Sequence, residues 1–183
     1  MLILKVSILL LYNKNNQHMK KLFLLAVLTS SFALAGFAQH DGDLKISLGP
    51  ELGFATGSFS DLYSISYGVT AQLEIKLQEK LHATVTSGII FYNGKSIGND
   101  TKVTGLNVIP LRVGAKCYFT PGIYGALQAG VGFFNKGGSA FAYSPQIGYE
   151  FVTKGGRGIE VTFKYDGYVN SISGLGIRFA WVL

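Results

Sequence analysis

Apolar and polar residues alternate with a period of two along residues 105–134, on both sides of a Thr120-Pro121-Gly122 turn. Such alternation is typical of β-strands that have one face in an apolar medium. The segment therefore predicts a β-hairpin, and the apolar positions of its two arms are Ile109, Leu111, Val113, Ala115, Cys117 and Phe119, then Ile123, Leu127, Ala129, Val131 and Phe133.

The same alternation returns along the rest of the chain after Gln39, where we find no helical periodicity. It predicts eight strands, at residues 44–54, 66–77, 81–92, 105–119, 123–134, 139–152, 158–166 and 174–183. Turns at 78–80, 120–122 and 153–157 alternate with polar or glycine-rich loops at 55–65, 93–104, 135–138 and 167–173, which are mostly longer. This arrangement is typical of an all-β, antiparallel up-and-down transmembrane β-barrel, in which an even number of strands brings both termini to one end.

Three prolines, Pro50, Pro110 and Pro145, fall inside these strands. Proline has no N–H group to donate to a neighbouring strand, and a closed barrel has no edge strand to hold it. We therefore expect bulges or local breaks at these positions, and one of these strands could be shorter than its predicted range.

The two faces of the strands differ in a way that predicts which one points outward. An eight-stranded barrel has an interior only just wide enough for packed side chains. The apolar face is too bulky for that space, with members such as Phe54, Tyr67, Phe91, Phe119, Phe133, Tyr149, Phe151, Phe163, Phe179 and Trp181. We therefore expect a membrane barrel with its apolar face outward; the alternative is a soluble lipocalin-like barrel with its apolar face inward.

The opposite face combines long polar residues with very small ones. Small residues would make room in a crowded lumen, where they lie at Gly49, Gly53, Gly68, Gly88, Gly114, Ala126, Gly130, Gly132, Ala142, Gly148, Gly176 and Ala180. Both charge signs occur, so ion pairs and hydrogen bonds can satisfy the polar groups away from bulk water. The expected lumen residues are Glu51, Gln72, Glu74, Lys76, His82, Arg112, Lys116, Gln128, Gln146, Glu150, Glu160, Lys164 and Arg178.

Aromatic residues gather at both ends of the predicted strands, as in the two interfacial girdles of membrane barrels. The loop end has Tyr63, Tyr67, Phe91, Tyr92, Phe133, Phe134, Phe141, Tyr143, Tyr165 and Tyr168, and the turn end has Tyr118, Phe119, Tyr124, Tyr149, Phe151, Phe179 and Trp181.

The first part of the chain has the three regions of a secretory signal peptide. Met19-Lys20-Lys21 is basic, residues 22–34 are apolar, and Gly36-Phe37-Ala38 supplies small residues before a cleavage site. The apolar run is too short for a transmembrane helix, which needs about 20 residues. We therefore expect a mis-assigned extension at 1–18, a signal peptide at 19–38 and the barrel domain at 39–183.

The net charge of +6 comes mainly from the region before the barrel. Four basic residues, Lys5, Lys14, Lys20 and Lys21, precede residue 39, whereas no acidic residue does. The remaining 12 basic and 10 acidic residues give the mature chain a net charge of +2. We therefore expect no nucleic-acid partner, since such partners are held by clustered positive charge.

The last predicted strand, GLGIRFAWVL at 174–183, has Leu175, Ile177, Phe179, Trp181 and Leu183 on one face. With it, the chain resembles the small eight-stranded outer-membrane β-barrel proteins of Gram-negative bacteria, of the OmpX and OmpA-barrel kind. It is similar in particular to the outer-membrane β-barrel domain group that includes PorT-like proteins. Their proline-leucine strand with a tyrosine-phenylalanine end matches Ile109-Pro110-Leu111 and Tyr118-Phe119.

The resemblance covers residues 44–183 and implies that the barrel-assembly machinery reads residues 174–183. The chain departs from the family in ending on Leu183 where an aromatic residue is more usual.

Candidate chemistry is sparse. His40 lies in the leading segment, and His82 lies on the polar face near a turn, at the end opposite to a surface-facing hydrolase site. Gly130 to Gly132 lacks the helix of a phosphate loop, and Asp41, Asp43, Asn99 and Asp100 lack the regular spacing of a cation loop. Cys117, the single cysteine, excludes an intramolecular disulfide, and we expect a buried, inert thiol. We predict no catalytic residue, cofactor or metal site.

These expectations together predict an integral protein of the cell outer membrane with a plugged polar lumen. It would contact outer-membrane lipid and act as a structural, surface-interaction or secretion-accessory protein and not as an enzyme. A narrow pore for water or small solutes and a lipid-modifying enzyme are the alternatives. Among the loops, residues 93–104 are polar, whereas residues 55–65 offer Phe59, Leu62 and Tyr63 for contact with lipid head groups or a protein.

Overall fold

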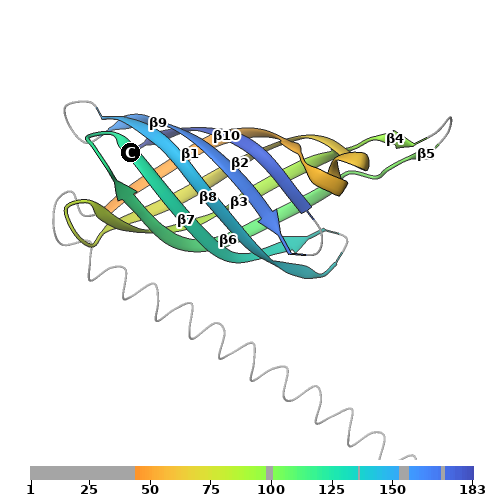
Figure 1. Ribbon diagram of the computed structural model, residues 1–183, viewed down its shortest axis with the longest axis horizontal. Coiled ribbons are helices and arrows are strands. Elements are labelled where there is room, and N and C mark those ends of the chain that lie inside the picture. Colours follow the sequence, from red (N-terminus) through yellow and green to blue (C-terminus); the bar gives the residue numbers. More distant parts are fainter. Residues whose placement is uncertain (1–43, 98–100, 136, 153–156, 170–171) are drawn as a thin grey trace, which may run out of the picture. The chain divides into compact units, whose positions relative to one another are not determined.

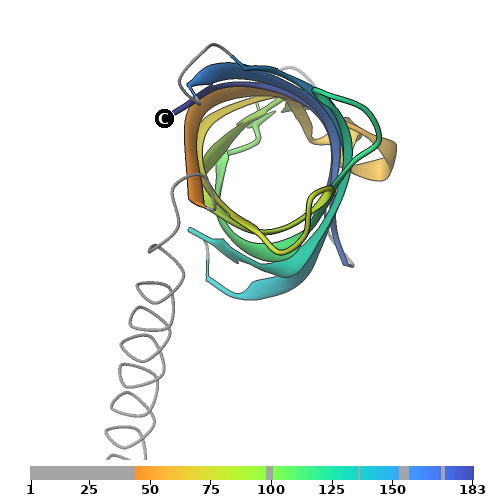
Figure 2. The ribbon, with the colours of Figure 1, turned by 90° about the vertical axis from the view of Figure 1, so that its left-hand side faces the viewer.

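The computed structural model describes residues 44–97, 101–135, 137–152, 157–169 and 172–183. Eight antiparallel strands form a closed barrel (Figures 1 and 2) in the circular order β1-β10-β9-β8-β7-β6-β3-β2. They are β1 (Leu44–Ala55), β2 (Tyr63–Lys76), β3 (Leu81–Gly94), β6 (Leu106–Tyr118), β7 (Ile123–Phe134), β8 (Ser139–Val152), β9 (Gly158–Tyr168) and β10 (Ile172–Val182). A small hairpin of β4 (Ser96–Ile97) and β5 (Thr101–Lys102) extends the β3–β6 connection. Within the described ranges, no helix is long and apolar enough to cross a membrane.

Pairing of the first strand with the last closes the ring. Ser47 lies opposite Val182 and Phe54 lies opposite Leu175. The amide of Leu183 also donates to the carbonyl of Ile46 at 2.9 Å. The described chain therefore begins and ends at the end of the barrel that has the tight turns, as the even number of strands predicted.

The predicted strands are confirmed, with shifts at their ends. The largest difference is at β2, which begins at Tyr63, three residues before its predicted start. In addition, β9 continues to Tyr168 and β10 begins at Ile172, each two residues beyond the predicted limit. The pairing explains both extensions, because Tyr63 pairs with Gly94 and Tyr168 pairs with Ile172 beyond the predicted limits.

Each proline interrupts one ladder without shifting its register. Pro50 pairs with Val69 on β2, but the β1–β10 ladder skips Gly49 and Pro50 and then resumes in the same register. The β3–β6 ladder skips Pro110 and the β8–β9 ladder skips Pro145 in the same way. These positions are local breaks and not bulges, because a missing N–H group removes pairing on one side only. Of the three strands, β6 is shorter than predicted, by one residue at each end and not at Pro110.

The side chains confirm the predicted inversion of polarity. Large apolar residues line the outer wall, where Val113 is 59% exposed and Leu127 61%, whereas Arg112 and Gln128, the adjacent residues on the inner face, are at most 1% exposed. A soluble protein would hide the first pair and expose the second. The wall therefore suits a hydrocarbon environment.

The predicted aromatic girdles are partly wrong. Outward-facing members include Tyr67, Phe133, Phe141 and Tyr143 near the loops and Phe119, Tyr149, Phe151, Phe179 and Trp181 near the turns. Tyr63, Tyr92, Tyr124 and Tyr168, in contrast, are buried inside the barrel. They occupy inward positions of the alternation, which residue type alone does not reveal.

The loop between β1 and β2 folds back over the barrel. It contains a short 3-10 helix, η1 (Gly57–Asp61), that buries Phe59. The ring of Phe59 stacks on Tyr63 with 4.4 Å between centroids and meets Tyr92 edge-on at 5.4 Å. The expectation that Phe59 and Tyr63 offer a surface for partners is therefore wrong, and of the three proposed residues only Leu62 is exposed.

Several predictions concern residues outside the described ranges. They are the extension at 1–18, the signal peptide at 19–38, the acidic residues Asp41 and Asp43, and the loop residues Asn99 and Asp100.

An arginine on the outer wall tests the inversion of polarity. We expect Val113→Arg, midway along β6, to lower the free energy of unfolding in liposomes by about 2–4 kcal/mol, because hydrocarbon solvates a guanidinium poorly. Ile46→Arg, near the start of β1, should cost only about 0–1 kcal/mol, because it lies close to the interface. Urea titrations that gave the two variants the same small cost would contradict a hydrocarbon-facing wall.

Candidate functional site

The lumen contains a set of buried polar side chains. The ammonium group of Lys116 lies at the centre of the group nearest to the turns. The Nζ atom of Lys116 lies 2.5 Å from Glu160 Oε2, 2.8 Å from Glu74 Oε2 and 3.7 Å from Glu150 Oε2. These carboxylates come from β2, β8 and β9, while Lys116 comes from β6. One cation therefore connects strands that are far apart around the barrel.

Further cations complete the neutralisation of this cluster. Arg178 Nη1 donates to Glu160 Oε1 at 2.9 Å, and Lys45 Nζ donates to Glu150 Oε1 at 2.7 Å. Three carboxylates thus face the three permanent cations Lys45, Lys116 and Arg178. Such balance is needed, because an unpaired buried charge costs several kcal/mol.

His82 and Tyr118 close the cluster toward the turns. His82 Nδ1 lies 2.6 Å from Glu74 Oε1, and the Tyr118 hydroxyl is hydrogen-bonded to both Glu74 and Glu150. This confirms the prediction that His82 is a lumen residue near the turn end. Its imidazole pairs with the Glu74 carboxylate inside the lumen.

A layer of amides and hydroxyls fills the middle of the lumen. The Nε2 atom of Gln128 lies 3.1 Å from Gln72 Oε1 and 2.9 Å from Thr86 Oγ1. Gln146 Nε2 in turn donates to Gln128 Oε1 at 3.1 Å. This neutral layer links β2, β3, β7 and β8.

A second ionic cluster lies between the amides and the loops. Lys164 Nζ bridges Glu51 Oε2 at 2.7 Å and Asp166 Oδ2 at 2.8 Å, and Arg112 pairs with Asp166. Ser144 also donates to Asp166 at 2.7 Å. Two cations face two carboxylates, so this cluster is also balanced.

The loop end of the lumen is closed by apolar residues. These side chains form one buried cluster made of Ala55, Phe59, Tyr63, Ile90, Tyr92, Leu106, Val108, Ala142, Tyr168 and Ile172. Among the described residues, the buried polar side-chain atoms without a hydrogen-bond partner are Arg112 Nε and Tyr168 Oη. Both residues lie where the ionic cluster meets the buried apolar cluster, which we call the apolar cap.

The predicted lumen residues are confirmed with one exception, but the list is incomplete. Lys76 is exposed at the end of β2, and Gln146 is only half-buried, while the other members are buried. The prediction missed Asp166, because its strand was expected to end there, and it missed the threonines and serines that bond to the charged groups. Alternation would have found them had every inward position been counted.

Two of the predicted lumen glycines make room for tyrosine rings. A side chain at Gly132 would collide with the ring of Tyr168, and one at Gly148 with the hydroxyl of Tyr124. That hydroxyl is hydrogen-bonded to Thr162 Oγ1 at 2.6 Å. The expected use of small residues is therefore correct at these positions, although the groups they accommodate are aromatic.

The arrangement of the lumen leaves little scope for metal binding. Glu74, Glu150 and Glu160 present oxygen atoms within 4.8 Å of one another, as a metal site would require. The Lys116 ammonium already lies among these oxygens and supplies the positive charge that a divalent ion would bring. We therefore conclude that these carboxylates form ion pairs with Lys116.

Cys117 differs from its prediction. Its thiol is exposed on the outer wall of β6, not buried. The apolar face of this barrel is its outside, so a residue on that face is covered by the surrounding medium and not by protein.

Removal of the central cation tests the first cluster. We expect Lys116→Met to lower the free energy of unfolding by about 3–5 kcal/mol, because it leaves buried carboxylates without their partner. The matched control is Lys76→Met, an exposed lysine, which should change stability by less than about 0.5 kcal/mol. Urea unfolding of both variants in the same detergent provides the measurement, and equal costs would contradict a network held by Lys116.

Comparison with known proteins identifies the fold. No protein-family model and no curated protein matches the sequence. The barrel is similar to the crystal structure of Ail, the attachment invasion locus protein of Yersinia pestis, with a TM-score of 0.54 and 9% identity over 79% of this chain and 100% of that chain. The structure of Ail in a phospholipid bilayer nanodisc gives a TM-score of 0.53, with 10% identity over 78% of this chain and 100% of that chain.

Neisserial surface protein A is also similar, with a TM-score of 0.49 and 11% identity over 77% of this chain and 96% of that chain. At these identities the likeness concerns the fold and not the activity. The chain has the closed eight-stranded antiparallel fold of the small bacterial outer-membrane β-barrels.

Proposed function

We propose that the protein is an integral outer-membrane β-barrel with a closed lumen, which anchors and displays its loops at the cell surface. The observation that carries this proposal is the filled interior. Two balanced ionic clusters, an amide layer and an apolar cap follow one another along the barrel. A scaffold of this kind is rigid, and function in rigid scaffolds is concentrated in the loops.

The apolar outer wall and the fold shared with Ail support a location in the outer membrane. The expected signal peptide agrees with export. The last strand, β10, closes the ring against β1. We therefore propose that the barrel-assembly machinery binds residues 174–183, and that outer-membrane lipid surrounds the mature wall.

The β3–β6 connection is the best candidate for contact with a surface partner. Its β4–β5 hairpin projects beyond the loop end of the barrel, as Figure 1 shows. In contrast, the β1–β2 loop packs against the barrel, because its Phe59 is part of the buried apolar cap. A structural, surface-interaction or secretion-accessory role fits this division between a closed barrel and one projecting hairpin.

The same interior argues against both alternatives. A pore needs a continuous polar path, whereas Arg112, Lys116 and Gln128 are each at most 1% exposed and bonded across the lumen. An acid-base enzyme needs groups open to substrate, and the buried carboxylates described above are bonded to cations. We therefore propose a role without catalysis or conduction.

Planar bilayer recordings test the closed lumen. We expect the reconstituted protein to give no steady single-channel current, because ionic and apolar layers block the path. Heat-modifiable gel migration of the same preparation controls for folding, so silence cannot come from an unfolded sample. A stable ohmic conductance that scales with inserted protein would contradict the proposal.

Labelling of intact cells tests the orientation. An epitope inserted after Gly137, which has open space around it, should bind antibody on intact cells. The matched insertion after Glu79, in the turn between β2 and β3, should bind only after permeabilisation, because tight turns of such barrels face the periplasm. The reverse pattern would contradict the proposed display of loops.

A further inference from the structure

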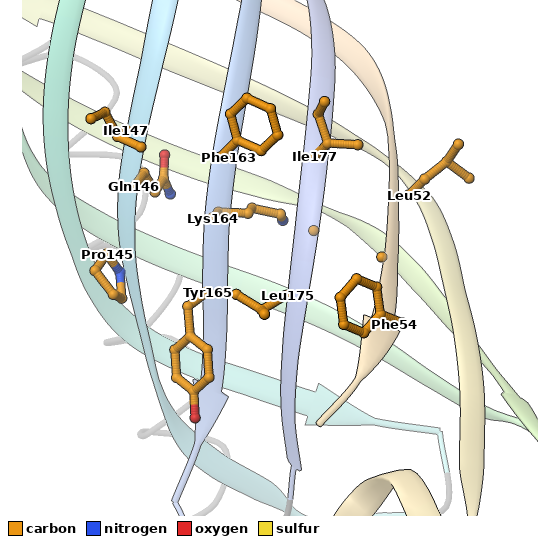
Figure 3. A pocket seen from close by; sticks show the side chains of 12 residues that line it. Leu52, Phe54, Pro145, Gln146, Ile147, Phe163, Lys164, Tyr165, Leu175 and Ile177 are labelled. Carbon is orange, nitrogen blue, oxygen red and sulfur yellow. The ribbon is translucent and has the colours of Figure 1, made fainter. Parts of the chain in front are cut away.

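Two hollows of the barrel differ in their chemistry. The hollow on the outer wall, shown in Figure 3, crosses β1, β10, β9 and β8 and presents apolar side chains such as Phe163 and Leu175. The charged residue at this hollow is Lys164, and its ammonium group is bound in the lumen by Glu51 and Asp166. The outer hollow is therefore part of the apolar wall, whereas a second pocket, at the turn end of the lumen, is lined by charged side chains.

The turn-end pocket has a volume of about 330 Å³, which suits a small ligand. Its walls are Lys45 from β1, Glu79, Lys80 and His82 from the β2–β3 turn and the start of β3, and Tyr118, Phe119, Thr120 and Pro121 from the end of β6 and the turn that follows. Lys45, His82 and Tyr118 also bond to carboxylates of the Lys116 cluster. The pocket is therefore the polar entrance to that cluster.

Backbone hydrogen bonds hold the rim of the turn-end pocket in place. The amide of Gln78 donates to the carbonyl of Leu81 at 2.9 Å, and the amide of Leu81 donates to the carbonyl of Gln78 at 3.3 Å. The amide of Tyr118 donates to the carbonyl of Lys80 at 2.8 Å, which joins the end of β6 to the β2–β3 turn. The side chains of Glu79 and Lys80 are thus exposed on a fixed backbone.

His82 has one ring nitrogen that its contact inside the lumen does not use. Nδ1 lies 2.6 Å from Glu74 Oε1, and it carries the proton of this contact because a carboxylate only accepts. The other nitrogen, Nε2, is not among the buried atoms of the described residues that lack a partner, although the side chain is only 7% exposed. Nε2 is therefore reached from the pocket that the ring lines, where in the neutral imidazole it accepts a hydrogen bond.

The remaining polar groups of the pocket have both charge signs. An ammonium group has three N–H donors, and Lys45 uses one of them on Glu150 while its side chain stays 26% exposed. Lys80 adds a second ammonium group on the rim, and Glu79 adds a carboxylate. The pocket therefore offers cations to an anionic group, acceptors to a cationic group, and the apolar surfaces of Phe119 and Pro121 to the body of a ligand.

We propose that the turn-end pocket binds a small zwitterion of the class of a free amino acid or dipeptide. Its carboxylate would lie on Lys45 and Lys80, and its ammonium group on Glu79 and His82 Nε2. A purely anionic ligand would meet the carboxylate of Glu79, and a purely cationic ligand would meet two lysines, so each fits less well. In the orientation proposed above the pocket opens to the periplasm; the compartment of the ligand rests on that proposal, but the binding does not.

Three forms of one dipeptide test the site. Isotope-labelled protein in detergent micelles is titrated with Ala-Leu, with N-acetyl-Ala-Leu and with Ala-Leu-amide, and backbone amide shifts are followed by nuclear magnetic resonance. We expect Ala-Leu to shift the amides of Lys80 and Thr120 and not that of Asn135 at the loop end. The acetylated and amidated forms should each bind about tenfold more weakly, because each lacks one charge-assisted contact.

Exchanges on the rim assign the two charges of the ligand. Lys80→Gln should weaken binding of the two forms with a free carboxylate by about threefold and leave the amidated form unchanged, since an exposed charge contributes modestly. Glu79→Gln should weaken only the two forms with a free ammonium group. The matched control is Lys76→Gln, an exposed lysine outside the pocket, which should leave all three affinities unchanged.

Each contrary outcome has a distinct meaning. Equal binding of Ala-Leu and its acetylated form would indicate a site for a carboxylate alone, such as the C-terminus of a partner protein, and would overturn the zwitterion site. Equal binding of Ala-Leu and its amidated form would overturn it as well. So would unshifted Lys80 and Thr120 amides in folded protein throughout the titration. None of these results bears on the closed lumen, which the bilayer recordings test separately.

Discussion

The pairing of β1 with β10 is the constraint on which the rest of the structure depends. It joins the ends of an eight-stranded sheet, so that no strand is left with an unpaired edge. In hydrocarbon an unpaired backbone group costs several kcal/mol, and a closed barrel satisfies these groups within its own wall. The three strand prolines are compatible with a closed barrel, since each interrupts one ladder for two residues and leaves the register unchanged.

Closure also determines where the charges can go. A narrow ring has an inner face with no access to lipid, and the ionic residues of the strands meet there as two neutral clusters. Lys116 takes a position that a metal ion could otherwise fill, and its bonds reach across the barrel from β6 to β2 and β9. The lumen thus stabilises the barrel from within, and the same contacts across it support the proposal of a closed lumen.

The sequence was sufficient for the strands, their order, the inward and outward faces, and most lumen residues, because a period of two records which face meets hydrocarbon. The sequence was insufficient where a residue lies on a different face of the strand from the one that its side-chain type suggests. Tyr92 and Tyr168 were interpreted as interfacial aromatics but form the cap, and Phe59 folds back on them from a loop without any periodic pattern. Cys117 was interpreted as buried, although the apolar face of this barrel is its surface. The hydrogen bonds and ion pairs between inward side chains depend on which distant strands face each other across the lumen. The alternation of residues along one strand does not contain this information.

Contacts between protein methyl groups and lipid test the inverted barrel most directly. In methyl-labelled protein reconstituted in nanodiscs, nuclear Overhauser effects would be measured from Val113 and Leu127 on the wall and from Val108 and Ile90 inside the cap. Our account predicts cross-peaks to the lipid acyl-chain methylenes for the first pair and cross-peaks only to protein for the second. Water cross-peaks at Val113 and Leu127, in a folded barrel, would contradict it.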